Sequence, residues 1–234
     1  MGTLLQHLLF VLLLVVAPAW DYWDTRRLKH SPSSPAKIRY YRTLCSWLWI
    51  GTAVALMALG WEPLFYSPGD LPWLQIASAR YLVDALIALL VLGIGLPVGI
   101  VLWKKLTKQP RKYGSSDALK SLDYFLPRTW SERRWFAFVC ITAGICEETL
   151  FRGFLLHYLH VGPWSLNLTL ALLISAAVFG LQHLYQGVAG TIQSGIIGLL
   201  FGLLFLLTGN LLAPMIVHAA LDLRMLVLLR PPTE

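Results

Sequence analysis

The chain has 234 residues, of which 57% are hydrophobic and only 13% are charged, with a formal net charge of +7. Roughly a quarter of the residues of an ordinary soluble domain are charged, so this composition excludes that class and indicates an integral membrane protein. The positive charge does not indicate a nucleic acid partner, because most basic residues gather in two loops between apolar segments. We therefore expect a lipid bilayer around the protein and no nucleic acid.

Seven apolar segments are long enough to cross a hydrocarbon core of about 30 Å, which takes about 20 helical residues. They are Leu4–Trp20, Leu44–Leu64, Tyr81–Trp103, Trp135–Leu159, Trp164–Leu184, Thr191–Leu207 and Leu211–Leu229. The predicted fold is an all-α integral membrane protein with about seven transmembrane helices in one bundle.

The first segment and the loop charges give the expected orientation. Ala17-Pro18-Ala19 resembles the cleavage site of a secretory signal, but residues 1–7 contain no Lys or Arg. A signal peptide carries a positive n-region, so we expect a retained helix. Six basic residues lie between residues 26 and 42, and nine more lie between residues 104 and 134. Because cytoplasmic loops are rich in Lys and Arg, we expect both loops in the cytoplasm and the N-terminus outside.

The fourth segment contains three ionisable residues in the stretch GICEETLFRG. Charged side chains inside a membrane cost at least a few kcal/mol, so they usually face the bundle interior and mark function. Glu148 and Arg152 are four residues apart, with the acid before the base, and this order favours an ion pair along one helical face. We expect this pair to be mainly architectural.

Glu147 points about 100° away from its neighbour Glu148 around the helix and has no local partner. A desolvated carboxylate without a cation accepts a proton readily, which suits a general base that takes a proton from water. The adjacent Cys146 is a weaker candidate, because apolar surroundings keep a thiol protonated and inert.

Two later segments supply further polar groups. FGLQH contains Phe179 and His183, and HAALD contains His218 and Asp222. The spacing of four places each pair on one helical face, so we expect Phe179 to pack beside the His183 imidazole. Asp222 is expected to accept a hydrogen bond from His218 and fix its tautomer. A lone histidine more often links helices, but several ionisable groups on three helices indicate a functional site.

The depths of these residues leave two interpretations open. At about 1.5 Å of rise per residue, Glu147 and His218 lie about 20 Å and about 18 Å from the inner face. His183 instead falls near the cytoplasmic border. Either the fifth helix starts well outside the hydrocarbon core, or the site is a cavity open to the cytoplasm. We favour the cavity, because water must reach a general base.

Together, these motifs resemble the CPBP family of intramembrane proteases, also called the Abi family, which includes CAAX proteases and bacteriocin-processing enzymes. Its pattern is E-E-x-x-x-R, then F-x-x-x-H, then H-x-x-x-N or D, each on a separate membrane helix. This chain has EETLFR from Glu147, FGLQH from Phe179 and HAALD from His218. The resemblance implies a catalytic helical core in residues 135–234. An N-terminal membrane region, residues 1–134, precedes it, with about three helices and basic cytoplasmic loops.

The resemblance also implies an activity and a location. It implies an endopeptidase of a bacterial plasma membrane that acts on membrane-associated or lipidated proteins or peptides, such as CAAX proteins. Glu147 and His183 would activate a water, while His218 and residue 222 would stabilise the oxyanion. Many members have Asn at that last position, and an ionised carboxylate would repel an oxyanion. Asp222 is therefore either protonated or serves only to orient His218.

The cofactor and the alternative function stay open. The family is commonly labelled metalloprotease, and Glu147, His183 and His218 are the candidate ligands for Zn²⁺ or another divalent metal. Glu147 cannot easily be both ligand and base, so we favour slightly a site without tightly held metal. The alternative is a non-hydrolytic peptide-immunity factor, scaffold or transporter that uses the same cluster for binding. A transporter more often shows broken helices or paired repeats, which this sequence does not display.

Overall fold

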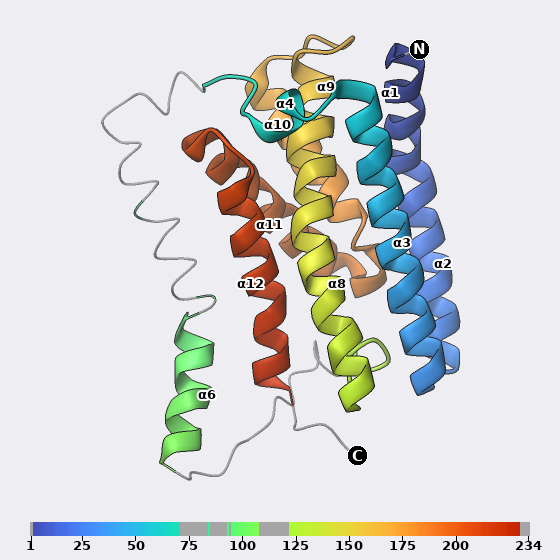
Figure 1. Ribbon diagram of the computed structural model, residues 1–234, viewed down its shortest axis with the longest axis vertical. Coiled ribbons are helices and arrows are strands. Elements are labelled where there is room, and N and C mark those ends of the chain that lie inside the picture. The colour runs from blue at the N-terminus through green and yellow to red at the C-terminus, as the bar shows by residue number, and fades with distance from the viewer. Residues whose placement is uncertain (1, 71–83, 85–92, 94, 108–121, 230–234) are drawn as a thin grey trace.

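The computed structural model describes residues 2–70, 84, 93, 95–107 and 122–229. In this part of the chain the regular structure is helical, apart from isolated β-bridges such as the one between Tyr66 and Asn210. The long helices stand side by side in one bundle (Figure 1). The predicted all-α architecture is therefore confirmed.

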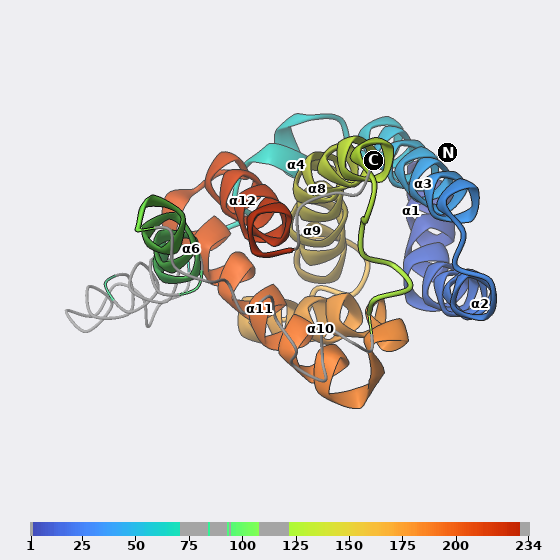
Figure 2. The same cartoon turned by 90° about the horizontal axis from the view of Figure 1, so that it is seen from below.

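The N-terminal part consists of two long helical rods. The first runs from residue 2 to residue 30 as α1 (Gly2–Val11), the π-helical segment η1 (Leu12–Val16) and α2 (Ala17–His30). After a short connection, α3 (Ser34–Leu59) returns beside it and is followed by the short α4 (Glu62–Phe65). Farther along the chain, α6 (Leu96–Leu106) stands at the edge of the bundle next to α12 (Figure 2).

The C-terminal part begins with a rod that runs from residue 130 to residue 160. It consists of α8 (Trp130–Glu148), the π-helical segment η4 (Thr149–Leu155) and α9 (Leu156–His160). Then come α10 (Leu168–Leu181), the 3-10 turn η5 (Leu184–Gln186), α11 (Gly187–Thr208) and α12 (Leu212–Leu228). In the bundle, α8 packs between α3 and α12, and α10 packs against α11 (Figure 2).

The predicted number of transmembrane helices is not confirmed. Among the described residues, three helical stretches are long and apolar enough to cross a membrane, namely Thr3–His30, Ser34–Leu59 and Leu184–Thr208. The predicted fifth span is too long, because α10 has 14 residues and the chain turns back after Leu181. Most of the predicted third span, Tyr81–Trp103, lies outside the described residues.

Helix α3, which corresponds to the predicted second span, starts ten residues before the predicted beginning at Leu44, where the Ser33 side chain caps it by accepting from the backbone N–H of Ala36. Lys37 on α3 is 3% exposed; its Nζ donates to the Leu126 carbonyl at 2.6 Å and lies 3.8 Å from the Glu132 carboxylate. This buried contact fixes the segment before α8 against α3. The Thr129 side chain then caps α8 by accepting from the backbone N–H of Glu132 at 3.2 Å.

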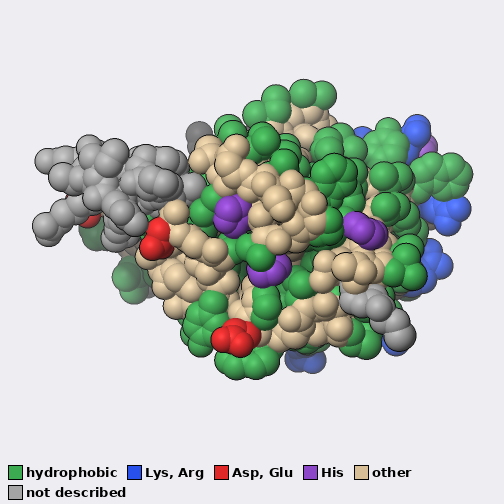
Figure 3. Space-filling model, turned by 90° about the horizontal axis from the view of Figure 1, so that it is seen from above, with side chains coloured by type: hydrophobic (Ala, Val, Ile, Leu, Met, Phe, Trp, Pro, Cys, Tyr) green, Lys and Arg blue, Asp and Glu red, His purple; other side chains and the backbone are tan. Residues whose placement is uncertain are grey.

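The connection between α2 and α3 and the start of α8 lie at the same end of the bundle, the lower end in Figure 1. These are regions that carry the basic residues predicted to face the cytoplasm. The opposite end, seen in Figure 3, presents mainly hydrophobic side chains, and Lys and Arg appear toward its margin. The gathering of basic residues agrees with one membrane side for both loops, and the orientation of the protein stays a prediction.

The crossing of α8 and α12 depends on a glycine. A Cβ atom at Gly144 would lie 2.9 Å from the backbone nitrogen of Ala219 and 2.9 Å from the carbonyl oxygen of Met215. Gly144 precedes Glu148 by about one turn, and Met215 and Ala219 flank His218 on α12. The close approach at this glycine therefore sets how near Glu148 and His218 can come.

We predict that Gly144→Ala pushes α8 and α12 apart and lowers the free energy of unfolding by about 1 to 3 kcal/mol, as overpacking does. Thermal unfolding of the purified protein in detergent would measure this. Gly99→Ala on α6 is the matched control, because a Cβ there meets nothing within 4 Å; it should leave the melting temperature unchanged or slightly raise it. Equal melting temperatures for the two variants would contradict the packing argument.

Candidate active site

The centre of the site is the carboxylate of Glu148 at the end of α8. Its Oε1 accepts from Nη1 of Arg152 at 2.9 Å and lies 2.7 Å from Nδ1 of His218. Because an ionised carboxylate only accepts hydrogen bonds, Nδ1 of His218 is the donor. Glu148 is 0% exposed. The predicted ion pair of Glu148 with Arg152 is present, and the same carboxylate also holds the imidazole from α12.

The guanidinium of Arg152 lies in a cage formed by α10 and α11. Its Nη2 donates to the carbonyl of Gly198 at 2.8 Å. Its Cζ lies 4.3 Å from the ring centroid of Phe179 and 5.5 Å from that of Phe201, so the cation faces two aromatic rings. A Cβ at Gly198 would lie only 2.8 Å from the Phe179 ring and 3.1 Å from Nη2. Glycine at this position thus makes room for the buried charge.

His218 joins the two glutamates of α8. Its Nε2 lies 3.9 Å from Oε2 of Glu147 and 3.6 Å from Oδ2 of Asp222, while its ring stacks on Phe201 with the centroids 5.0 Å apart. The contact with Asp222 is longer than a hydrogen bond. The hydrogen bond from His218 that was predicted to reach Asp222 goes instead to Glu148, which fixes the orientation of the ring.

His183 stands where α10 has ended. Its backbone has φ −102° and ψ 21°, in a sparsely populated region where active-site residues are often found. Its Nδ1 lies 2.9 Å from the carbonyl of Phe179, and the two rings are 4.9 Å apart, which confirms the predicted packing of Phe179 beside this imidazole. Because a carbonyl only accepts, Nδ1 carries a proton and Nε2 of the neutral ring is an acceptor.

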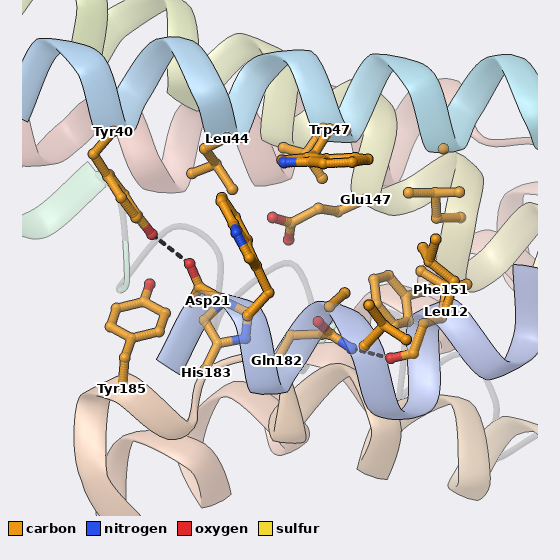
Figure 4. A pocket seen from close by; sticks show the side chains of 17 residues that line it. Leu12, Asp21, Tyr40, Leu44, Trp47, Glu147, Phe151, Gln182, His183 and Tyr185 are labelled. Atoms are coloured by element: carbon orange, nitrogen blue, oxygen red, sulfur yellow. Dashed lines mark hydrogen bonds between the residues drawn. The ribbon is translucent and has the colours of Figure 1, made fainter. Parts of the chain in front are cut away.

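Glu147 and His183 line one cavity of about 220 Å³ (Figure 4). Most of its lining is apolar, from η1, α2, α3 and the start of η4. The other members include Leu12, Leu13, Val16, Trp20, Asp21, Tyr40, Leu44, Trp47, Phe151, Gln182 and Tyr185. Trp20, which lies at the predicted end of the first span, is thus part of the cavity wall. The N-terminal rods complete a site whose motif residues all come from the C-terminal part.

Both π-helical segments border this cavity. η1 contributes Leu12 and Leu13, and η4 contributes Leu150 and Phe151. The Gln182 amide donates a hydrogen bond to the Leu13 carbonyl, so the turn after α10 is tied to η1. π-helical turns interrupt the regular ladder and are frequent at functional sites. Here they occur where the chain must shape a cavity beside buried charges.

The candidate metal ligands are not arranged as a metal site. Within the described residues, no group of three His, Cys, Asp or Glu side chains has a geometry that could hold a metal ion. In the network around His218, Nδ1 donates to Glu148, and Nε2 lies 3.9 Å from the Glu147 carboxylate and 3.6 Å from that of Asp222. Of the three candidate metal ligands, only Glu147 and His183 line the cavity.

The structure brings Glu147, Glu148, Arg152, His218 and Asp222 into one network, with His183 on the wall of the adjoining cavity. Phe201, which contacts both Arg152 and His218, was not among the site residues predicted from the sequence. Asp21 and Tyr40, which are hydrogen-bonded to each other in the cavity wall, were not predicted either. The position of Asp21, just past a predicted span, was the available signal for an unusual acid.

Comparison with known proteins gives one family. Residues 129–224 match the model of a family described as type II CAAX prenyl endopeptidase, Rce1-like. The matched segment contains all three motifs, from Glu147 to Asp222, and confirms the resemblance that they indicated. No curated protein and no solved structure matches the chain.

We predict that Arg152→Ala strongly destabilises the fold, because it leaves the buried Glu148 carboxylate without its cation; breaking such a pair costs about 3 to 5 kcal/mol. The measurement is thermal unfolding in detergent at equal protein concentration. Arg39→Ala, which removes an exposed arginine of α3, should change the melting temperature little. If both variants unfold like the unaltered protein, the buried pair does not support the fold.

Proposed function

We propose that this chain, whose residues 129–224 match the model of the Rce1-like family of type II CAAX prenyl endopeptidases, is an intramembrane endopeptidase. Its substrates would be membrane-associated or lipidated proteins or peptides. The observation that carries the proposal is that Glu147 at the end of α8 and His183 in the turn after α10 line one cavity. That cavity adjoins a buried network which fixes the imidazole of His218 near Glu147.

Glu147 and His183 are the proposed groups that activate water. The Nδ1 proton of His183 is committed to the Phe179 carbonyl, so Nε2 can accept a hydrogen bond from a water. Glu147 has 17% of its side chain exposed and belongs to the same cavity wall, so its carboxylate can accept the proton that the water loses. Attack on a peptide carbonyl by this water would give the oxyanion intermediate of hydrolysis.

His218 is the proposed donor to that oxyanion. Its Nδ1 is held by Glu148 at 2.7 Å, and its Nε2 points toward Glu147 and Asp222. Three carboxylates around one imidazole favour the form with a proton on both nitrogens. Such a ring keeps its bond to Glu148 and still donates from Nε2 to a developing negative charge.

Asp222 is proposed to assist by orientation and charge. Its carboxylate lies 3.6 Å from Nε2 of His218, and 43% of its side chain is exposed in the protein alone. An ionised carboxylate at this place would repel a developing oxyanion. We assign it to stabilising the protonated imidazole, and the contact with the oxyanion falls to His218.

We further propose that the reaction does not need a tightly held metal, because only Glu147 and His183 of the three candidate ligands line the cavity. Prolonged dialysis of active protein against a chelator, followed by metal analysis, tests this. Full cleavage activity at a metal content far below one ion per chain is expected. Loss of activity that returns only with Zn²⁺ or another divalent ion would overturn the proposal.

The activity itself is tested with purified protein in liposomes and a prenylated peptide that ends in a CAAX sequence. We predict specific cleavage, with a rate lowered at least about 100-fold in Glu147→Ala and His183→Ala, as expected for loss of a general base. Glu62→Ala and His30→Ala, at exposed positions, are the matched controls and should cleave like the unaltered protein.

Equal cleavage by all five proteins would show that the assignment of Glu147 and His183 is wrong. Binding of the peptide without cleavage by any of them would instead favour a non-hydrolytic role for the same residues. Product masses identify the bond that is cut, which separates specific cleavage from contaminating proteases.

A further inference from the structure

Asp21 of α2 is a buried acid that the proposed reaction does not use. It is 9% exposed and belongs to the wall of the cavity that contains Glu147 and His183. Figure 4 shows its carboxylate beside Tyr40, on the side of the cavity where Tyr185 lies. An ionisable side chain in a membrane-spanning helix is costly and usually serves a function.

The contacts of Asp21 differ from those of the other buried acids. Glu148 pairs with Arg152 at 2.9 Å, and Glu132 lies 3.8 Å from Lys37. Asp21 instead accepts one hydrogen bond, at 2.5 Å, from the hydroxyl of Tyr40. None of the ion pairs formed by the described residues includes Asp21. Its carboxylate therefore has a neutral donor and lacks the cation that the other two have.

The rest of this cavity wall matches a long side chain with a cationic end. Apolar residues such as Leu44 and Val16 line the space, and a (CH₂)n stem can pack along them. Two indoles, Trp20 and Trp47, also line it, with ring centroids 6.1 Å apart. Aromatic faces attract ammonium and guanidinium groups. A carboxylate, aromatic rings and apolar walls together suit lysine or arginine.

The basic residues of α2 do not fill this role. Arg26 and Lys29 lie farther along the helix, and both are exposed. Arg26 lies over the ring of Tyr22 at 5.6 Å, and Lys29 lies over that of Tyr124 at 6.0 Å. They line a separate pocket that shares Tyr185 with the cavity. Exposed charges of this kind are screened by salt, so they leave the Asp21 carboxylate available to a ligand.

We propose that Asp21, held by Tyr40, forms a subsite that binds a lysine or arginine side chain of the peptide substrate. The inference rests on the proposed function for the ligand being a peptide. Asp21 is a specificity-determining residue in this account, because it contacts the substrate away from the bond that is cut. Tyr40 is a positioning residue, since its hydroxyl orients the carboxylate.

The test uses a set of otherwise identical prenylated peptides in which lysine is placed in turn at each position near the cleaved bond. At each position, norleucine replaces lysine as the uncharged control of similar length. For the unaltered protein in liposomes, kcat/KM at one position should be at least about tenfold higher with lysine than with norleucine, as a hydrogen-bonded charge contact implies. In Asp21→Asn this ratio should fall to near one.

Asp24→Asn is the matched control, because Asp24 lies on the same helix but not in the lining of the cavity. It should keep the preference for lysine. Tyr40→Phe should keep part of the preference, since the carboxylate remains while its orienting hydroxyl is lost. A merely structural Asp21 would lower the melting temperature of Asp21→Asn without changing the ratio of lysine to norleucine, and this result would overturn the subsite.

A binding measurement separates this inference from the proposed function. The affinities of the same lysine and norleucine peptides are measured with the Glu147→Ala variant. This variant lacks the proposed general base, so binding is measured without cleavage. A preference for lysine that disappears in Glu147→Ala/Asp21→Asn supports the subsite even if no protein cleaves the peptides. Specific cleavage without any preference that depends on Asp21 supports the peptidase and overturns the subsite.

Discussion

The arrangement of the site depends on one buried carboxylate, that of Glu148. Its Oε1 receives hydrogen bonds from a guanidinium on its own helix and an imidazole on α12, so three ionisable groups are paired at one carboxylate oxygen inside an apolar bundle. A carboxylate in such surroundings is tolerated only when it is paired. Two packing features allow this pairing. Gly144 lets α8 and α12 approach closely, and the rings of Phe179 and Phe201 surround the guanidinium of Arg152. The neighbouring Glu147 is then directed away from the pair and toward the cavity.

The division between support and chemistry follows from the helical repeat. Two consecutive glutamates point in directions about 100° apart, so one can be fully buried while the other faces a cavity. The structure shows this difference, with 0% exposure for the Glu148 side chain and 17% for Glu147. The short α10 adds the second cavity group, because His183 follows the point where that helix ends. An acid, a neutral imidazole and a fixed proton donor thus come from three separate parts of the chain, and the ion network around Glu148 holds the acid and the donor in place.

Local spacing predicted the parts of the site that lie on a single helix. The pair Glu148–Arg152 and the packing of Phe179 on His183 both follow from residues four apart. Contacts between helices were harder to predict, since they depend on the rotation and depth of each helix. The bond from Glu148 to His218, the stacking of Phe201 and the cavity position of Asp21 are of this kind. The apolar run through residue 184 likewise gave no sign that α10 ends at Leu181, so the predicted number of spans was not confirmed.

The central claim is that water activated in the cavity attacks the peptide bond directly, with no covalent link between substrate and protein. Mass spectrometry of the products formed in ¹⁸O-labelled water, with hydroxylamine present as a competing nucleophile, tests it most directly. Direct attack predicts a new carboxyl end that carries ¹⁸O and no hydroxamate. A hydroxamate product would reveal an acyl intermediate, for instance on Cys146, and would contradict the account.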